Sequence, residues 1–176
     1  MNKRRVFGAV LLVVILLVVA VLPASAGATK TPFTGMCSLP PLEVSSPDAR
    51  VWYAGETTHM RDDISGFNCT FSDDRLDGVL HGVTNWNVRE YYSDEEPYWW
   101  VLGHQDGAMT ILDAFGNVLW EGGHVVTYYE PWKATGHAWL HGRGPYEGLQ
   151  VQSSLWWDLL AGVGPSWEGE ILDPGK

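Results

Sequence analysis

The sequence predicts an all-β fold, an antiparallel up-and-down barrel of seven to eight strands, with a β-sandwich as the alternative. From Val51 onward, short apolar and aromatic runs alternate with turn residues, and no window of a dozen residues keeps a helical period. A sheet of that size without a covering helix must close on itself or fold into two layers. Glycines inside the expected strands favour closure, because the tight bends of barrels form at such positions. These glycines are Gly78, Gly82, Gly122, Gly123 and Gly136.

The strands can be placed from their composition and from the turns between them. Every second residue is apolar or small over residues 149–157, and residues 166–172 alternate in the same way, which places one face of each strand in the core. Residues 113–117 have the composition of a hairpin loop, and residues 105–107 that of a tight turn. The expected strands are 57–62, 76–89, 98–104, 108–112, 118–129, 134–141, 149–158 and 166–172.

The first 26 residues are predicted to be an export signal and not part of the fold. Basic residues at 3–5 precede an apolar run from Val6 to Leu22, and Ala-Ser-Ala at 24–26 is the pattern that a signal peptidase reads. Cleavage after Ala26 would give a secreted or extracytoplasmic protein that begins at Gly27 and has no stable membrane span. The alternative is an N-terminal membrane anchor, because the run is only slightly shorter than the roughly 20 residues that span a bilayer.

The charge of the chain excludes one class of partner. Against 21 acidic residues the whole chain has 11 Lys and Arg, and the predicted mature part, which loses three of them, has a net charge of 8 minus 21, or -13. Such a field repels phosphate backbones. We therefore expect no nucleic acid partner.

Residues 27–50 are interpreted as an N-terminal arm, and residues 51–176 as the barrel domain. Prolines at 32, 40, 41 and 47 stand among Ser, Thr and Gly with no apolar period. Both cysteines, Cys37 and Cys69, follow the predicted cleavage site, so a disulfide is expected, with two buried thiols as the alternative. This disulfide would stabilise the fold by roughly 3.5 to 4 kcal/mol.

The segment Gly142-Arg143-Gly144-Pro145-Tyr146-Glu147-Gly148 resembles the G-x-G-x-[FY]-x-G turn of the allene oxide cyclase and dirigent barrel superfamily. Stretches 120–122, 135–139 and 167–174 are also similar to small secreted bacterial members, so the resemblance covers roughly residues 117–174. It implies that Gly142, Gly144 and Gly148 form a corner between strands and that Tyr146 plugs the barrel end. Val151 departs from the family pattern, which often has a small residue there. No catalytic residue of the plant cyclases matches position by position, so their activity is not carried over.

No pattern in the chain predicts a metal or a cofactor. His137 and His141 lie in an expected strand, where residues four apart stand about 13 Å from each other, too far for one metal ion. Residues 73–78 hint at a calcium loop, but Arg75 takes the place of an oxygen ligand, so a solvated acidic turn is expected. The signatures of nucleophile elbows, phosphate loops and dinucleotide sites are missing.

All ten Trp lie after the predicted cleavage site. For any one of them, a place in the core is the ordinary explanation. The pairs Trp99-Trp100 and Trp156-Trp157 carry more information, because adjacent strand residues face opposite sides and one of each pair must leave the core. An outward Trp indicates a ligand face or a subunit contact. The ligand-binding candidates are Trp86, Trp100, Tyr128 and Trp139.

Three function classes fit the sequence. The first is a secreted barrel that binds an apolar or aromatic small molecule. The second is a cofactor-free cyclase or isomerase of the allene oxide cyclase or dirigent type, whose proton-transfer candidates are His81, His104, His124 and Glu121. The third is a carbohydrate-binding or structural exported protein whose exposed Trp contact sugars or further copies of the chain in a homo-oligomer.

Overall fold

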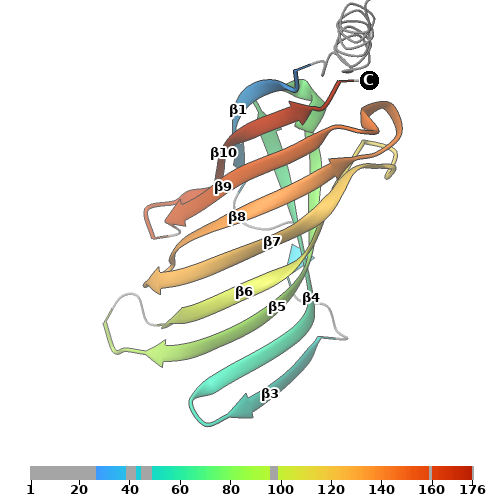
Figure 1. The fold of residues 1–176 in the computed structure, drawn as a ribbon. Coiled ribbons are helices and arrows are strands. Elements are labelled where there is room, and N and C mark those ends of the chain that lie inside the picture. The colour runs from blue at the N-terminus through green and yellow to red at the C-terminus, as the bar shows by residue number, and fades with distance from the viewer. Residues whose placement is uncertain (1–26, 39–42, 45–48, 96–98, 159, 176) are drawn as a thin grey trace, which may run out of the picture. The chain divides into compact units, whose positions relative to one another are not determined.

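The computed structural model describes residues 27–38, 43–44, 49–95, 99–158 and 160–175. Residues 30–173 form one compact unit that contains the sheet. Eight strands close into a ring in the order β4-β5-β6-β7-β8-β9-β10-β1, and β1 pairs back with β4 (Figure 1). These strands are β1 (Thr29–Cys37), β4 (Thr57–Phe71), β5 (Gly78–Tyr92), β6 (Trp99–Leu112), β7 (Val118–Glu130), β8 (Lys133–Gly142), β9 (Gln150–Asp158) and β10 (Val163–Asp173). The predicted all-β antiparallel fold with a closed sheet is confirmed, and one ring takes the place of the alternative sandwich.

The ring closes at one end of β4. Residues 35–37 of β1 pair with residues 69–71 of β4, and the predicted disulfide between Cys37 and Cys69 links one of these directly opposed pairs. Farther toward its start, the same edge of β4 pairs with two short strands, β2 (Glu43–Val44) and β3 (Arg50–Ala54). The disulfide is therefore a covalent link at the closing contact of the ring.

Two predictions about the strands are wrong. Residues 29–37 of the predicted arm form β1, and Pro32 lies outside the segment that pairs with β4. Residues 105–107 are not a turn, because they pair on both sides, with β5 and with β7, inside one continuous β6. A Cβ on Gly107 would lie 2.2 Å from the carbonyl oxygen of Val83, so this glycine permits close contact of strands.

The end of the ring near the closing contact is packed. Trp120 is fully buried, donates from its indole Nε1 to the carbonyl oxygen of Arg75 at 2.8 Å, and stacks on Tyr146 with the ring centroids 5.4 Å apart. Tyr146 lies in the short 3-10 helix η2 (Gly144–Tyr146) between β8 and β9. Gly144 and Gly148 have positive φ, as a corner built on glycine requires. Tyr146 is only half-buried, so it covers the core at this end and does not fill it.

Several local predictions are confirmed. The alternation in β9 and β10 buries Val151, Leu155, Trp157, Trp167 and Ile171. Residues 113–117 form a hairpin loop between β6 and β7, held by hydrogen bonds between Asp113 and Asn117. No helix in the described part of the chain is long and apolar enough to cross a membrane. The predicted export signal, residues 1–26, lies outside the described residues.

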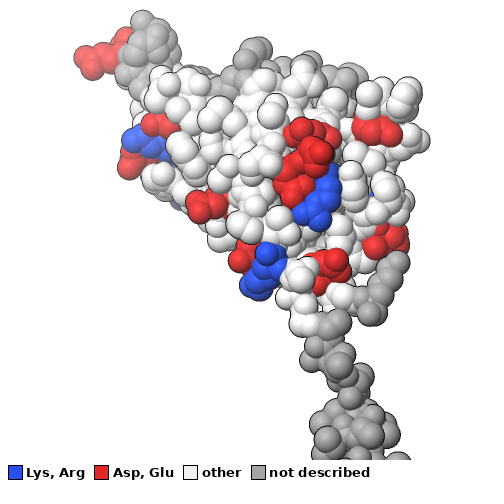
Figure 2. Space-filling model, turned by 90° about the horizontal axis from the view of Figure 1, so that it is seen from above, with Lys and Arg blue, Asp and Glu red and all other residues white. Residues whose placement is uncertain are grey.

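The charged side chains form no basic surface on the face seen in Figure 2. Acidic groups are more numerous there than basic ones, and the basic groups lie beside acidic ones. Several basic side chains among the described residues form ion pairs with acidic ones, as Lys30 does with Glu170 and Lys133 with Glu130.

Candidate functional site

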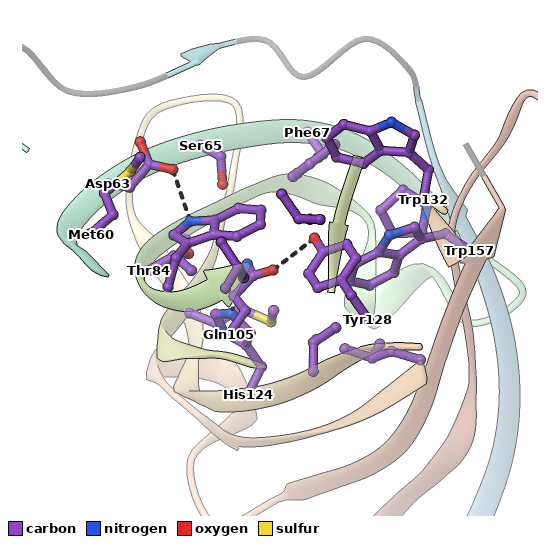
Figure 3. Close-up of a pocket in the computed structure, with 18 of the residues that line it drawn as sticks. Met60, Asp63, Ser65, Phe67, Thr84, Gln105, His124, Tyr128, Trp132 and Trp157 are labelled. Atoms are coloured by element: carbon purple, nitrogen blue, oxygen red, sulfur yellow. Dashed lines mark hydrogen bonds between the residues drawn. The ribbon is translucent and has the colours of Figure 1, made fainter. Parts of the chain in front are cut away.

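A cavity of about 420 Å³ lies inside the ring. Its wall is mostly apolar and aromatic, and Figure 3 shows side chains from several strands converging on it. Proteins typically bind small molecules in pockets of this size and composition. The apolar lining residues are Met60, Phe67, Leu80, Trp86, Val88, Trp99, Val101, Met109, Val126, Tyr128, Trp132, Leu155, Trp157, Pro165 and Trp167.

Strand alternation decides which side chains reach the cavity. Even-numbered residues of β5 and β7 face inward, as do odd-numbered residues of β6, β9 and β10. Trp86 and Tyr128 are brought together in this way from β5 and β7, with ring centroids 5.4 Å apart and planes 22° from parallel. Trp157 of β9 meets the edge of Tyr128 at 5.7 Å. The three rings form one continuous aromatic wall.

A β-bulge in β4 turns Asp63 into the cavity. Thr58 and Met60 face inward before the bulge, whereas Asp63, Ser65 and Phe67 do so after it. The register with β5 shifts between Met60 and Asp63, and Asp62 has a φ of 62°, which is uncommon for a residue with a side chain. Bulges of this kind re-aim side chains next to binding sites. The strain at residue 62 therefore accompanies a carboxylate inside an apolar cavity.

Away from the rim, polar groups of the wall form two hydrogen-bonded sets (Figure 3). In the first, Trp86 Nε1 donates to Asp63 Oδ2 at 3.1 Å. In the second, the Tyr128 hydroxyl donates to Gln105 Oε1 at 3.0 Å, and Gln105 Nε2 lies 3.5 Å from His124 Nε2. Thr84 Oγ1 and His124 Nδ1 are both buried and have no hydrogen-bond partner among the described residues. Groups of this kind indicate a ligand, because a buried polar atom without a partner costs about 1 to 3 kcal/mol.

Burial sets the protonation of the cavity groups. It lowers the pKa of His124, an effect that the negative charge of Asp106 partly opposes. It raises the pKa of the Tyr128 hydroxyl, and the negative charge of Asp63 adds to this shift. At neutral pH the cavity therefore contains a neutral imidazole and a neutral phenol.

The rim of the cavity is aromatic, and the carboxylate of Glu90 holds several of its side chains in place through hydrogen bonds. Glu90 accepts hydrogen bonds from Thr58 Oγ1 at 2.6 Å, from the Tyr92 hydroxyl at 2.7 Å and from Trp99 Nε1 at 3.2 Å, and the first two contribute most to lowering its pKa. Trp132 donates from Nε1 to the carbonyl oxygen of Trp99 at 2.6 Å, and the two rings meet edge to face. Trp132 has a φ of 55° in the turn between β7 and β8, which is a strained conformation.

The predicted site residues fall into two groups. His124, Trp86 and Tyr128 line the cavity together. The others lie outside it, on strand positions of the opposite parity or on the outer face, and they are His81, His104, Glu121, Trp100 and Trp139.

The residues outside the cavity have other contacts. His104 Nδ1 lies 3.1 Å from Thr127 Oγ1, and Glu121 pairs with Arg143. Trp100 stacks on Tyr91, and Trp139 is 45% exposed. In the pair Trp156-Trp157, Trp157 is buried and lines the cavity and Trp156 is exposed, as predicted. In the pair Trp99-Trp100, Trp99 lines the cavity but is itself 41% exposed.

Sequence reasoning missed most of the polar residues of the wall, among them Asp63, Thr84 and Gln105. Thr84 could have been found from strand parity, since Trp86 and Thr84 share a face two residues apart. Gln105 lies in the segment that was predicted as a turn, so parity did not reach it. Asp63 could not, because its inward direction depends on the bulge. No group of three or more His, Cys, Asp or Glu within the described ranges could hold a metal ion. In the acidic turn at residues 73–78, Arg75 forms an ion pair with Asp73, and Arg75 Nη2 lies 2.6 Å from Asp73 Oδ2.

Comparison of the chain with protein-family models, with curated proteins and with solved structures finds no match. The likeness to allene oxide cyclase and dirigent barrels therefore stays a prediction, based on the turn at residues 142–148 and the stretches around it. The function must be argued from the cavity itself.

Proposed function

We propose that this protein binds an apolar or aromatic small molecule inside the ring. The observation that carries the proposal is the cavity of about 420 Å³, whose wall is mostly hydrophobic and contains a few polar groups at fixed positions. Such a wall supplies most of the binding free energy through apolar contact, while the polar groups orient the ligand.

The aromatic wall favours a ligand with a ring or a flat apolar body. Trp86 and Tyr128 are stacked on each other, and the edge contact of Trp157 with Tyr128 restrains both. A ligand that meets these rings loses little conformational entropy on the protein side, because the wall is already ordered. Offset or edge-to-face contact with aromatic rings adds about 0.5 to 1.5 kcal/mol for each pair.

Tryptophan fluorescence tests the proposal, because several Trp line the cavity. A panel of apolar and aromatic ligands should include members that quench the emission saturably. Trp86→Leu should weaken the binding of such a ligand about tenfold or more, as expected for a central aromatic contact. Trp139→Leu is the matched control, since Trp139 lies on the outer face, and it should leave affinity unchanged. A panel without any saturable binder, or equal loss in both variants, would refute the proposal.

A cofactor-free cyclase or isomerase is the second candidate, and His124 favours it. Its imidazole is neutral, buried and directed into the apolar cavity, so it is able to accept a proton from a bound substrate. The test is conversion of a ligand already found to bind. His124→Gln should lower the rate by about 10² to 10⁴ while affinity is kept. His104→Gln is the matched control on the outer face, and equal rates in the two variants would exclude this role.

A carbohydrate-binding or structural role would rest on the outward Trp139 and Trp156, which are both largely exposed. Such a role does not require a cavity, so we rank it below small-molecule binding and below the cyclase or isomerase. Export and signal cleavage after Ala26 are also proposed. The disulfide between Cys37 and Cys69 supports export, because disulfides persist in oxidising compartments.

A further inference from the structure

The charge of the cavity wall is one-sided. Two carboxylates, Asp63 and Glu90, belong to the wall, and no Lys or Arg is among the described residues that line it. The lining histidine, His124, is held neutral by burial. In a cavity with a low effective dielectric constant, a carboxylate attracts a cation and repels an anion more strongly than it does in water. The wall therefore selects ligands by the sign of their charge.

The deeper carboxylate is fixed in place. Asp63 is only 8% exposed, and its Oδ2 atom accepts a hydrogen bond from the indole of Trp86. The bulge at residue 62 is what directs this side chain inward, although the backbone is strained there. A strained backbone that orients one buried acid suggests that the acid has a role beyond the stability of the fold.

Aromatic rings surround the same region. The indole that holds Asp63 stacks on Tyr128, and Tyr128 meets Trp157. The faces of Trp and Tyr rings attract cations, by about 0.5 to 1 kcal/mol at exposed sites and by about 2 or more where water is excluded. The rings and the carboxylate thus favour the same sign of charge in one apolar cavity.

The hydroxyl of Thr84 adds a hydrogen-bond acceptor beside Asp63. Thr84 is the strand partner of Asp63 across the β4–β5 pair, so the two side chains start from neighbouring points on the wall. Its Oγ1 atom is buried and has no hydrogen-bond partner among the described residues. An ammonium group donates up to three hydrogen bonds, and a hydroxyl oxygen is able to accept one of them.

We propose that the ligand of this cavity is an organic cation, an amine that is protonated at neutral pH and attached to an apolar or aromatic body. The ammonium group binds Asp63 and the nearby hydroxyl of Thr84, and the apolar body lies against the rings of Trp86, Tyr128 and Trp157. Carboxylate ligands such as fatty acids should bind weakly, because Asp63 and Glu90 in the wall repel their negative charge. The inference rests on the proposed function, since it names the ligand class of the same cavity.

Three probes with one ring system and different charges test the inference. They are 2-naphthylmethylamine, 2-naphthylmethanol and 2-naphthoate, titrated into the exported protein by isothermal calorimetry at neutral pH. The amine should bind at least about tenfold more tightly than the alcohol, because a charged hydrogen bond replaces a neutral one. The naphthoate should bind most weakly.

Two neighbouring carboxylates provide matched variants. Asp63→Asn should remove the advantage of the amine and leave the affinity for the alcohol within about threefold. Asp62→Asn removes the same charge from the adjacent residue, whose side chain is exposed and pairs with Arg50, and asparagine tolerates the positive φ found there. This control should keep the preference for the amine.

The possible results separate the inference from the function it rests on. If the alcohol binds as tightly as the amine to the unaltered protein, or if Asp63→Asn keeps the preference, the inference is refuted and small-molecule binding stands. If Asp63→Asn does not fold, the comparison of the three probes on the unaltered protein still decides. If none of the three probes binds but the ligand panel contains a saturable binder, the inference is refuted and small-molecule binding stands. If the panel contains no binder either, both are refuted.

Discussion

Removal of the disulfide should weaken the closure of the ring. Cys37 and Cys69 are opposed residues in the short β1–β4 pairing, 32 positions apart in the sequence. Crosslinking a loop of that length stabilises the folded state by about 3.5 to 4 kcal/mol, because it restricts the unfolded chain. The double variant Cys37→Ala/Cys69→Ala should therefore lose at least that much free energy of unfolding, since each Ala also lacks a buried sulfur.

Urea unfolding followed by circular dichroism measures this loss. The native protein should be destabilised by reductant, and reduction leaves every side-chain atom of the two residues in place. The double variant should not respond to reductant at all, which makes it the matched control. A loss below about 1 kcal/mol, which is far under the loop-closure value, would show that this bond does not fix the ring.

The remaining predictions concern the corner, the cavity and the processing of the chain. Gly148→Val should destabilise the fold by more than about 1 kcal/mol, because Gly148 has a φ of 93°, and an unchanged melting temperature would contradict this. Tyr146→Ala should lower the melting temperature too, but by less than a fully buried ring would, because Tyr146 is half-buried; a loss of about 3 to 5 kcal/mol would contradict that placement. His124 has a lowered pKa in the folded state, so stability should fall as pH drops below the unfolded value of 6.5, and His124→Gln should reduce this fall in urea titrations at several pH values. If His124→Gln and the native protein show the same dependence on pH, His124 is not the cause. Intact-mass analysis of exported protein should find a chain that begins at Gly27 without free thiols, and retention of residues 1–26 would contradict cleavage.

The sequence was informative where local pattern alone determines structure. Alternation in β9 and β10 predicted their inner faces, and the hairpin loop at residues 113–117 followed from its turn residues. The disulfide followed from the number and position of the cysteines. In each case the determining interactions lie within a few residues or depend on composition.

The sequence was misleading where pairing with distant strands overrides local preference. Residues 105–107 have the composition of a turn, but pairing with β5 and β7 keeps them extended. Prolines in residues 27–50 hid β1, which is a strand because β10 and β4 lie beside it. Residues 63–71 were not recognised as part of β4, because the bulge breaks their alternation.

The same bulge explains the gap in the predicted site. Parity along β5 and β7 separates Trp86, Tyr128 and His124, which line the cavity, from His81 and Glu121, which do not. Parity shows which residues of a strand share a face, but the register of strand pairing decides which face lines the cavity. The sequence leaves that register open where a strand is apolar on both faces. The inward direction of the Asp63 side chain also depends on the bulge in β4, where one extra residue shifts the alternation.

A crystal structure of the protein soaked with 2-naphthylmethylamine would show directly where the amine binds. We expect electron density for the naphthyl ring inside the ring of strands, against Trp86 and Tyr128, with the amine nitrogen within hydrogen-bond distance of an Asp63 oxygen. Density only on the outer face, beside Trp139 or Trp156, or an interior filled by side chains, would contradict this expectation.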